Sequence, residues 1–169
     1  FAAVLDFQVV RTLDAIIICV PTPLNKTKDP DLGMVVEAVD RIIENRRENQ
    51  LVVLESTTYP GTTEELILPK FQDAGASVGV DFFLAFSPER VDPGNSIYKT
   101  SNIPKVIGGV TPPCSEVASK LYSNFIEKIV RVSSSRTAEM VKLLENTFRS
   151  VNIGLVNEIA LICDCLLYT

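Results

Sequence analysis

Short runs of hydrophobic residues alternate along this chain with stretches in which hydrophobic residues recur every three or four positions. The short runs are rich in β-branched and aromatic residues and predict β-strands. They lie at Asp14–Val20, Leu51–Leu54, Phe82–Phe86, Lys105–Ile107 and Lys128–Val132. The stretches between them predict helices that begin near Asp31, after Pro60-Gly61 with Thr62 or Thr63 as the cap, and at Thr111-Pro112. This alternation predicts an α/β fold with a mainly parallel sheet and flanking helices.

The pattern changes near Thr137, where hydrophobic residues begin to follow steps of three and four without an internal proline. Such spacing predicts one long helix. Its apolar positions are Val141, Leu144, Phe148, Val151, Leu155, Ile159, Ile162 and Leu166. We therefore divide the chain into an α/β part, residues 1–134, and a long helix, residues 135–169, whose apolar face is expected to need a partner. The G-x-G-x-x-G turn that opens a typical dinucleotide-binding fold is absent, so the sequence predicts the later part of a Rossmann-like sheet.

Composition narrows the possible functions. The 169 residues include 16 basic and 21 acidic side chains, and the formal net charge of −5 argues against a nucleic acid or an anionic membrane as partner. No histidine is present, which excludes histidine-based catalysis and histidine metal ligands. The four cysteines lack metal-type spacing, so we expect buried, reduced thiols, no metal and a cytoplasmic location. The strongest apolar run, Ala15–Val20, is too short to span a bilayer.

Polar residues gather where the first two predicted strands end. Val20-Pro21-Thr22-Pro23 follows the first strand, at the edge where open α/β sheets bind ligands, although it could simply terminate the strand. Several hydroxyl groups follow the second strand beside a predicted helix start, an arrangement that suits a phosphate or an oxyanion. Helix capping explains a later threonine of this turn but not Ser56, Thr57 and Thr58 together. A functional role is therefore favoured for the turn.

A further polar segment, Ser87–Asn95, follows the third strand. It offers a carboxylate for acid–base chemistry, Glu89, and a guanidinium for binding an anion, Arg90. The alternative is a surface ion pair that contributes little to stability.

Polar residues also interrupt the long helix. Lys142, Asn146 and Arg149 have the spacing of one helix face, which is more often an ordinary hydrophilic stripe than a site. Asn152 and Asn157 extend them into a strongly apolar region, although asparagine is a poor helix former. We expect a buried polar row here, which would need hydrogen-bonding partners such as those that a ligand offers.

These segments resemble, in order, those of the UDP-glucose/GDP-mannose dehydrogenase family. The matching segments are Ile16–Leu24, Glu55–Thr63, Phe86–Asn95, Pro104–Gly109 and Ala138–Glu158. They extend over nearly the whole chain, and five motifs in register are far more specific than any one of them. The third and fifth are most similar to the bacterial branch that acts on UDP-N-acetylhexosamines.

The resemblance implies an NAD-dependent enzyme that oxidises the C6 alcohol of a UDP-sugar, UDP-N-acetylglucosamine or a similar one, to a uronate in two NAD-linked steps. The family reaction proceeds through a thiohemiacetal and a thioester on a cysteine, and supplies polysaccharide precursors. The implied catalytic residues are Thr57, Glu89, Lys142 and Asn146. The implied cofactor-binding residues are Val20, Pro21, Thr22, Ser56 and Thr57. The implied substrate-binding residues are Glu89, Arg90, Val91, Lys142, Asn146 and Arg149.

Each implied role suits the chemistry of the side chain. Thr57 would contact the cofactor and the reacting water, and Glu89 would position or activate that water. Lys142 would stabilise the developing oxyanion, with Asn146 orienting water or substrate beside it. The long helix would form the core of a homodimer.

The resemblance further implies that the family's glycine-rich turn lies before Phe1 and its nucleophilic cysteine beyond Thr169. We therefore expect a fragment that is inactive by itself. Two alternatives remain at this stage: a non-catalytic domain that binds a nucleotide or serves in assembly, and another β-hydroxyacid dehydrogenase relative. The motifs at Glu55–Thr63 and Ser87–Asn95 argue against the second alternative.

Overall fold

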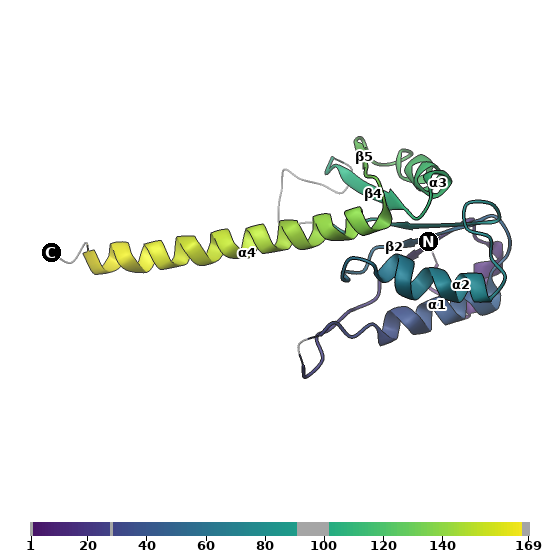
Figure 1. The fold of residues 1–169 in the computed structure, drawn as a ribbon, viewed down its shortest axis with the longest axis horizontal. Coiled ribbons are helices and arrows are strands. Elements are labelled where there is room, and N and C mark those ends of the chain that lie inside the picture. Colours follow the sequence, from purple (N-terminus) through teal and green to yellow (C-terminus); the bar gives the residue numbers. More distant parts are fainter. Residues whose placement is uncertain (1, 28, 91–101, 167–169) are drawn as a thin grey trace.

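The computed structural model describes residues 2–27, 29–90 and 102–166, and its core is a five-stranded sheet (Figure 1). The strands are β1 (Ala15–Ile18), β2 (Gln50–Leu54), β3 (Phe82–Phe86), β4 (Lys105–Gly109) and β5 (Ile129–Arg131), in that spatial order. Neighbouring strands pair in parallel except β3 and β4, which are antiparallel. The predicted α/β fold with a mainly parallel sheet is therefore confirmed.

Helices cover both faces of the sheet (Figure 1). They are a 3₁₀ turn η1 (Phe7–Thr12), α1 (Gly33–Asn45), a wide helical segment η2 (Thr62–Ile67) that continues into α2 (Leu68–Asp73), and α3 (Pro112–Tyr122). Side chains alternate along β2 because successive residues of a strand point to opposite faces. Val52 and Leu54 pack in the cluster shared with α1 and α2, whereas Leu51 and Val53 pack in the cluster shared with α3.

Two adjacent glycines let helices approach β4 closely from both sides. A methyl group on Gly108 would lie 2.0 Å from the carbonyl oxygen of Ser134, at the start of the last helix. A methyl group on Gly109 would lie 2.3 Å from the backbone nitrogen of Ser115 in α3. This glycine pair does not have dinucleotide-motif spacing, and its role here is close packing.

The last helix, α4 (Ser135–Leu166), has 32 residues, and the predicted long helix is confirmed. Its first turns pack against the sheet, where Ala138 and Glu139 are fully buried. From Asn146 to Leu166 every residue is exposed, and the helix projects away from the rest of the chain (Figure 1). The expected buried polar row is therefore wrong for this chain, because Asn152 and Asn157 lie on this projecting part.

Three of the four cysteines contradict the expectation of buried thiols. Cys114 is buried between α3 and the sheet, whereas Cys19, Cys163 and Cys165 are exposed, and all four are free. Cys19 lies just beyond β1, and Cys163 and Cys165 lie on the projecting part of α4, where no described residue covers them. Across the described residues, no His, Cys, Asp and Glu group is arranged to hold a metal ion, and no helix is sufficiently long and apolar to cross a membrane.

Candidate functional site

The ends of β1 and β2 are tied together by hydroxyl groups. The backbone amide of Val20 donates to Ser56 Oγ at 2.9 Å, and the same hydroxyl donates to the carbonyl oxygen of Val20 at 2.8 Å. The Thr22 hydroxyl donates to the carbonyl oxygen of Thr57 at 2.7 Å. These bonds fix the Val20–Thr22 segment beside the turn that follows β2. Pro21, between the two tied residues, is exposed at this edge.

This edge has the donor chemistry that a dinucleotide needs. Thr57 is exposed, and among the described residues only its carbonyl group, not its hydroxyl, has a hydrogen-bond partner. A hydroxyl at the carboxyl end of a parallel strand suits the ribose or nicotinamide part of a dinucleotide. The buried Thr58 hydroxyl lacks a hydrogen-bond partner within the described part of the chain. The residues present therefore fit NAD at this edge.

The turn after β2 is capped from a distant helix rather than by its own threonines. Glu139 of α4 accepts hydrogen bonds from the backbone amides of Gly61 at 2.5 Å and Thr63 at 2.9 Å, and from the Thr63 hydroxyl at 2.7 Å. Gly61 has a positive φ of 108° and occupies the cap position, so the expected capping by Thr62 or Thr63 is wrong. Burial raises the pKa of Glu139, although these three donors act in the opposite direction.

Lys142, one turn beyond Glu139, reaches the segment that follows β3. Its ammonium donates to the carbonyl oxygen of Glu89 at 2.5 Å. Burial lowers the pKa of Lys142, while the carboxylates of Glu145 and Glu89 act against that shift. The structure thus brings together Glu89 and Lys142, two of the predicted catalytic residues that are far apart in the sequence.

The Arg90 guanidinium contacts other residues of the protein. Its guanidinium donates to the carbonyl oxygen of Pro104 at 2.8 Å and pairs with Glu145 of α4 at 2.5 Å. These contacts hold the segment after β3 between β4 and the long helix.

The remaining predicted residues divide into two groups. Asn146 and Arg149 follow Lys142 along α4 and are exposed, and Arg149 lies close enough to Lys142 to influence its pKa. Val91, and the rest of the predicted segment to Asn95, lies outside the described residues.

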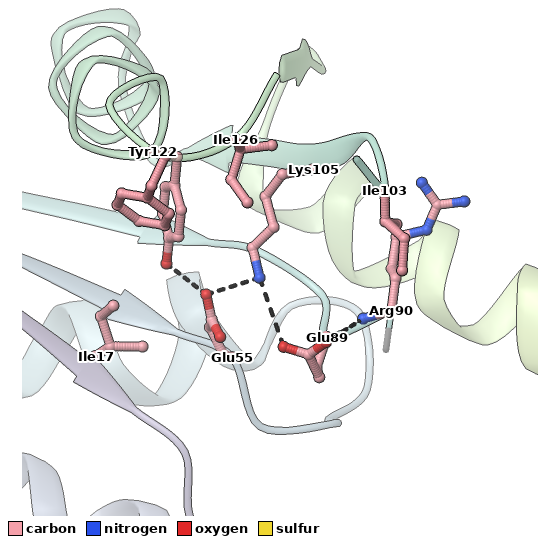
Figure 2. Close-up of a pocket in the computed structure, with 9 residues that line it drawn as sticks. Ile17, Glu55, Glu89, Arg90, Ile103, Lys105, Tyr122 and Ile126 are labelled. Carbon is pink, nitrogen blue, oxygen red and sulfur yellow. Dashed lines mark hydrogen bonds and ion pairs between the residues drawn. The ribbon is translucent and has the colours of Figure 1, made fainter. Parts of the chain in front are cut away.

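Sequence reasoning missed a buried polar cluster next to Glu89 (Figure 2). Glu55 Oε1 accepts a hydrogen bond from the Tyr122 hydroxyl at 2.5 Å and pairs with Lys105 Nζ at 2.8 Å. Burial and the Glu55 carboxylate raise the pKa of Tyr122, which therefore stays protonated as a donor. These residues line a small pocket together with Glu89 and Arg90. The sequence predicts Lys105 only as the first residue of a strand. Its place in the site becomes apparent from the structure, where it lies opposite Glu55.

A mainly parallel sheet with hydroxyl groups at the adjacent ends of its strands defines an α/β domain of the dinucleotide-binding dehydrogenase class. Residues 2–126 match the model of the UDP-glucose/GDP-mannose dehydrogenase family, NAD binding domain, and residues 136–167 match that of the family's central domain. The chain belongs to the UDP-glucose/GDP-mannose dehydrogenase family, and its α/β part carries residues of the NAD-binding domain.

Curated and structural relatives agree with this membership. The chain is 44% identical to UDP-N-acetyl-D-mannosamine dehydrogenase of Pyrococcus horikoshii, over 86% of this chain and 35% of the relative. It is 38% identical to UDP-N-acetyl-D-glucosamine 6-dehydrogenase of Pseudomonas aeruginosa, over 93% of this chain and 38% of the relative. The solved UDP-D-ManNAc dehydrogenase of Pyrococcus horikoshii superposes with a TM-score of 0.86 at 41% identity, covering 93% of this chain and 37% of that one. The chain thus spans little more than a third of the length of these relatives.

Proposed function

We propose that this chain is part of an NAD-dependent nucleotide-sugar dehydrogenase that oxidises the C6 alcohol of a UDP-sugar to a uronate. The observation that carries the proposal is the contact between Lys142 and Glu89, which joins an ammonium to a segment bearing a carboxylate at the cofactor edge of the sheet. Family membership and the names of the relatives support the same reaction class.

The proposed domain boundary lies where α4 begins. Residues 1–134 would form the later part of the NAD-binding domain, and residues 135–169 would begin the central domain with the long helix. The clamp between Glu139 and Thr63 supports a fixed geometry across this boundary, because it holds the first turns of α4 against the turn after β2.

The proposed cofactor residues are those tied together at the ends of β1 and β2. Bound NAD⁺ supplies the hydride acceptor for each of the two oxidation steps. Val20, Pro21 and Thr22 would line one side of the cofactor site. Ser56 holds this segment in place through its hydroxyl, and the exposed Thr57 hydroxyl is available to the cofactor and to the reacting water.

The proposed catalytic residues handle water and charge. Glu89 would accept a proton from the water that supplies the second oxygen of the carboxylate product. Lys142 would stabilise negative charge on the sugar oxygen, and Asn146, one turn along the same helix, would orient water or substrate beside it. The contact between the Lys142 ammonium and the Glu89 backbone carbonyl keeps an ammonium and a carboxylate-bearing residue side by side, which suits these complementary roles.

The proposed substrate is UDP-N-acetylglucosamine or a similar UDP-N-acetylhexosamine, oxidised for the synthesis of polysaccharide precursors. Relatives named for N-acetylmannosamine and N-acetylglucosamine support an acetamido sugar. Arg90, Val91 and Arg149 would contribute to the nucleotide-sugar side of the site. Because the Arg90 guanidinium already binds Pro104 and Glu145, its contribution would be to shape the segment that contacts the sugar.

The proposed partner of the projecting helix is a second copy of this chain. Phe148, Val151 and Leu155 are each more than half exposed, and a helix with such side chains is stabilised in water when an apolar surface covers it. A compartment that keeps thiols reduced, the cytoplasm, suits the exposed free cysteines.

The test is Lys142→Ala in the intact enzyme that contains this chain, with NADH formation followed at 340 nm and UDP-N-acetylglucosamine as substrate. Loss of the oxyanion-stabilising ammonium is expected to lower kcat on the order of 100-fold or more. Lys128→Ala, at an exposed lysine before β5, serves as the matched control and keeps wild-type turnover. Turnover that survives Lys142→Ala would instead favour a domain that only binds the nucleotide or serves in assembly.

A further inference from the structure

The buried cluster beside Glu89 contains an ammonium that the proposed reaction does not use. Lys105 opens β4, Glu55 follows β2, and Tyr122 ends α3, so three separate elements meet here (Figure 2). Lys105 Nζ lies 2.8 Å from Glu55 Oε1 and 5.2 Å from the centre of the Tyr122 ring. The ammonium is thus held by a carboxylate and an aromatic face at once.

Lys105 faces a second carboxylate at the mouth of the pocket. Its Nζ lies 3.8 Å from Glu89 Oε2, as the dashed line in Figure 2 indicates. The Lys105 and Glu55 side chains are only 11% and 10% exposed, whereas that of Glu89 is 49% exposed. One buried cation therefore stands between an enclosed carboxylate and one that opens to solvent.

The backbone around Glu89 is fixed independently of this cluster. The Ser87 hydroxyl donates to the carbonyl oxygen of Val106 at 2.8 Å, and Arg90 donates to that of Pro104. Both acceptors flank Lys105 on β4. One carboxylate oxygen of Glu89, Oε1, accepts a hydrogen bond from the Arg90 backbone amide at 2.8 Å. The other oxygen, Oε2, is the one that the ammonium of Lys105 is placed to influence.

Stability alone does not account for burying this ammonium. Desolvation largely offsets the attraction within a buried ion pair, and apolar replacements of such pairs are often as stable. Without the cation, however, the carboxylates of Glu55 and Glu89 would face each other across the pocket, and repulsion would turn the more exposed one outward.

We propose that Lys105 is a positioning residue that holds the Glu89 carboxylate at the reaction site, with Glu55 and Tyr122 holding Lys105 in turn. This inference rests on the proposed function, because Glu89 is the residue that handles water in that reaction. Lys105 itself touches neither substrate nor cofactor in the proposed reaction, and it acts through Glu89.

The first test compares Lys105→Met, which keeps the length but removes the charge, with Lys105→Arg, which keeps the charge, in the intact enzyme. We expect Lys105→Met to lower kcat at least about tenfold, because misplacing a reacting group by about 1 Å costs on the order of 100-fold. The KM for the UDP-sugar should change less than about twofold, and Lys105→Arg should restore most of kcat. Lys120→Met, at an exposed lysine of α3, is the matched control.

An unchanged kcat in Lys105→Met would overturn the proposal, and so would an equal loss in Lys105→Arg and Lys105→Met. If Lys105→Met also loses NAD⁺ binding, the variant Glu55→Gln tests the proposal instead. This variant keeps the side-chain oxygen that accepts a hydrogen bond from Tyr122, but it lacks the negative charge that attracts the Lys105 ammonium. A wild-type kcat in Glu55→Gln would then contradict the proposal, whereas a lowered kcat with unchanged KM would support it.

Cys19 provides a readout that does not depend on turnover. Its Sγ lies 3.8 Å from Glu55 Oε2, and although the residue is exposed, partial desolvation of the thiol and the Glu55 carboxylate raise its pKa, whereas Lys105 lowers it. Since the thiolate is the reactive form, alkylation of Cys19 should slow in Lys105→Met and accelerate in Glu55→Gln. Unchanged rates in both variants would contradict the cluster geometry. If these rate changes are present but the wild-type enzyme turns over no UDP-sugar, the proposed function is contradicted and the cluster geometry is not.

Discussion

The carboxylate of Glu139 accepts hydrogen bonds from both the backbone amide and the hydroxyl of Thr63, 76 residues earlier, at 2.9 and 2.7 Å. Glu139 lies on the first turns of α4 and Thr63 lies on the turn after β2, so this contact joins the long helix to the NAD-binding part of the chain. Lys142 follows Glu139 by one helical turn. The clamp therefore sets where the Lys142 ammonium lies relative to the ends of the strands.

Glu139→Ala should destabilise the protein strongly. The substitution leaves the buried amides of Gly61 and Thr63 without their acceptor, and each buried donor left unsatisfied costs about 1–3 kcal/mol. Urea unfolding followed by circular dichroism measures this loss. Glu158→Ala, at an exposed position of the same helix, is the matched control and should change the free energy of unfolding by less than about 0.5 kcal/mol. Equal stabilities of the two variants would contradict the clamp.

Gly108→Ala should also destabilise the protein, for a steric reason. The new methyl group would lie 2.0 Å from the Ser134 carbonyl oxygen, so α4 would have to move away from β4, at a cost of about 1–3 kcal/mol or more. Gly33→Ala is the matched control, because its methyl group would meet only the flexible Asp31 side chain at 3.1 Å. Thermal unfolding should separate the two variants, and equal melting temperatures would show that the close approach at Gly108 is not required.

The strands and the long helix could be predicted because their patterns are local. The β-branched run at Ala15–Ile18 and the aromatic run at Phe82–Phe86 each form strands, and the hydrophobic spacing after Thr137 forms a single helix. The antiparallel pairing of β3 and β4 could not be predicted in this way, because strand direction depends on where the intervening segment returns to the sheet.

The site residues likewise divide into those with a local sequence signal and those without one. Glu89 and Lys142 could be predicted from motifs, since each belongs to a segment with a recognisable sequence. The Glu139 clamp and the Glu55–Lys105–Tyr122 cluster could not, because each joins residues distant in sequence with no local signal. The sequence predicts Thr62 or Thr63 as the cap, but Gly61, with its positive φ, occupies that position, and the Glu139 carboxylate of α4 accepts from its amide.

Activity should fall on the alkaline side at a pH set by Lys142. Burial lowers the pKa of this ammonium from its ordinary value of 10.5, and the charged form is the one that stabilises an oxyanion. In the intact enzyme kcat should therefore decline as the pH rises through this lowered pKa. Lys142→Arg keeps its charge and should shift the decline to higher pH, even if kcat is smaller. Superimposable pH profiles, scaled only in height, would exclude Lys142 as the titrating group.

Self-association should depend on the apolar face of α4. Phe148→Glu combined with Leu155→Glu places charges where the proposed second copy packs, and should convert dimers into monomers in analytical ultracentrifugation. Asn157→Glu, at another exposed position of the same helix that carries no apolar side chain, should leave the dimer intact. A monomeric wild-type protein would remove the proposed dimer.

The stoichiometry of NADH formation tests the proposed reaction most directly. Conversion of a C6 alcohol to a carboxylate removes two hydrides, so two NADH should form for each UDP-N-acetylhexosamine consumed. The intact enzyme containing this chain would be assayed with limiting UDP-N-acetylglucosamine and, separately, UDP-N-acetylmannosamine, with absorbance at 340 nm read at completion. Two NADH per sugar with either substrate is the predicted result. One NADH per sugar, or none with any UDP-sugar, would contradict it.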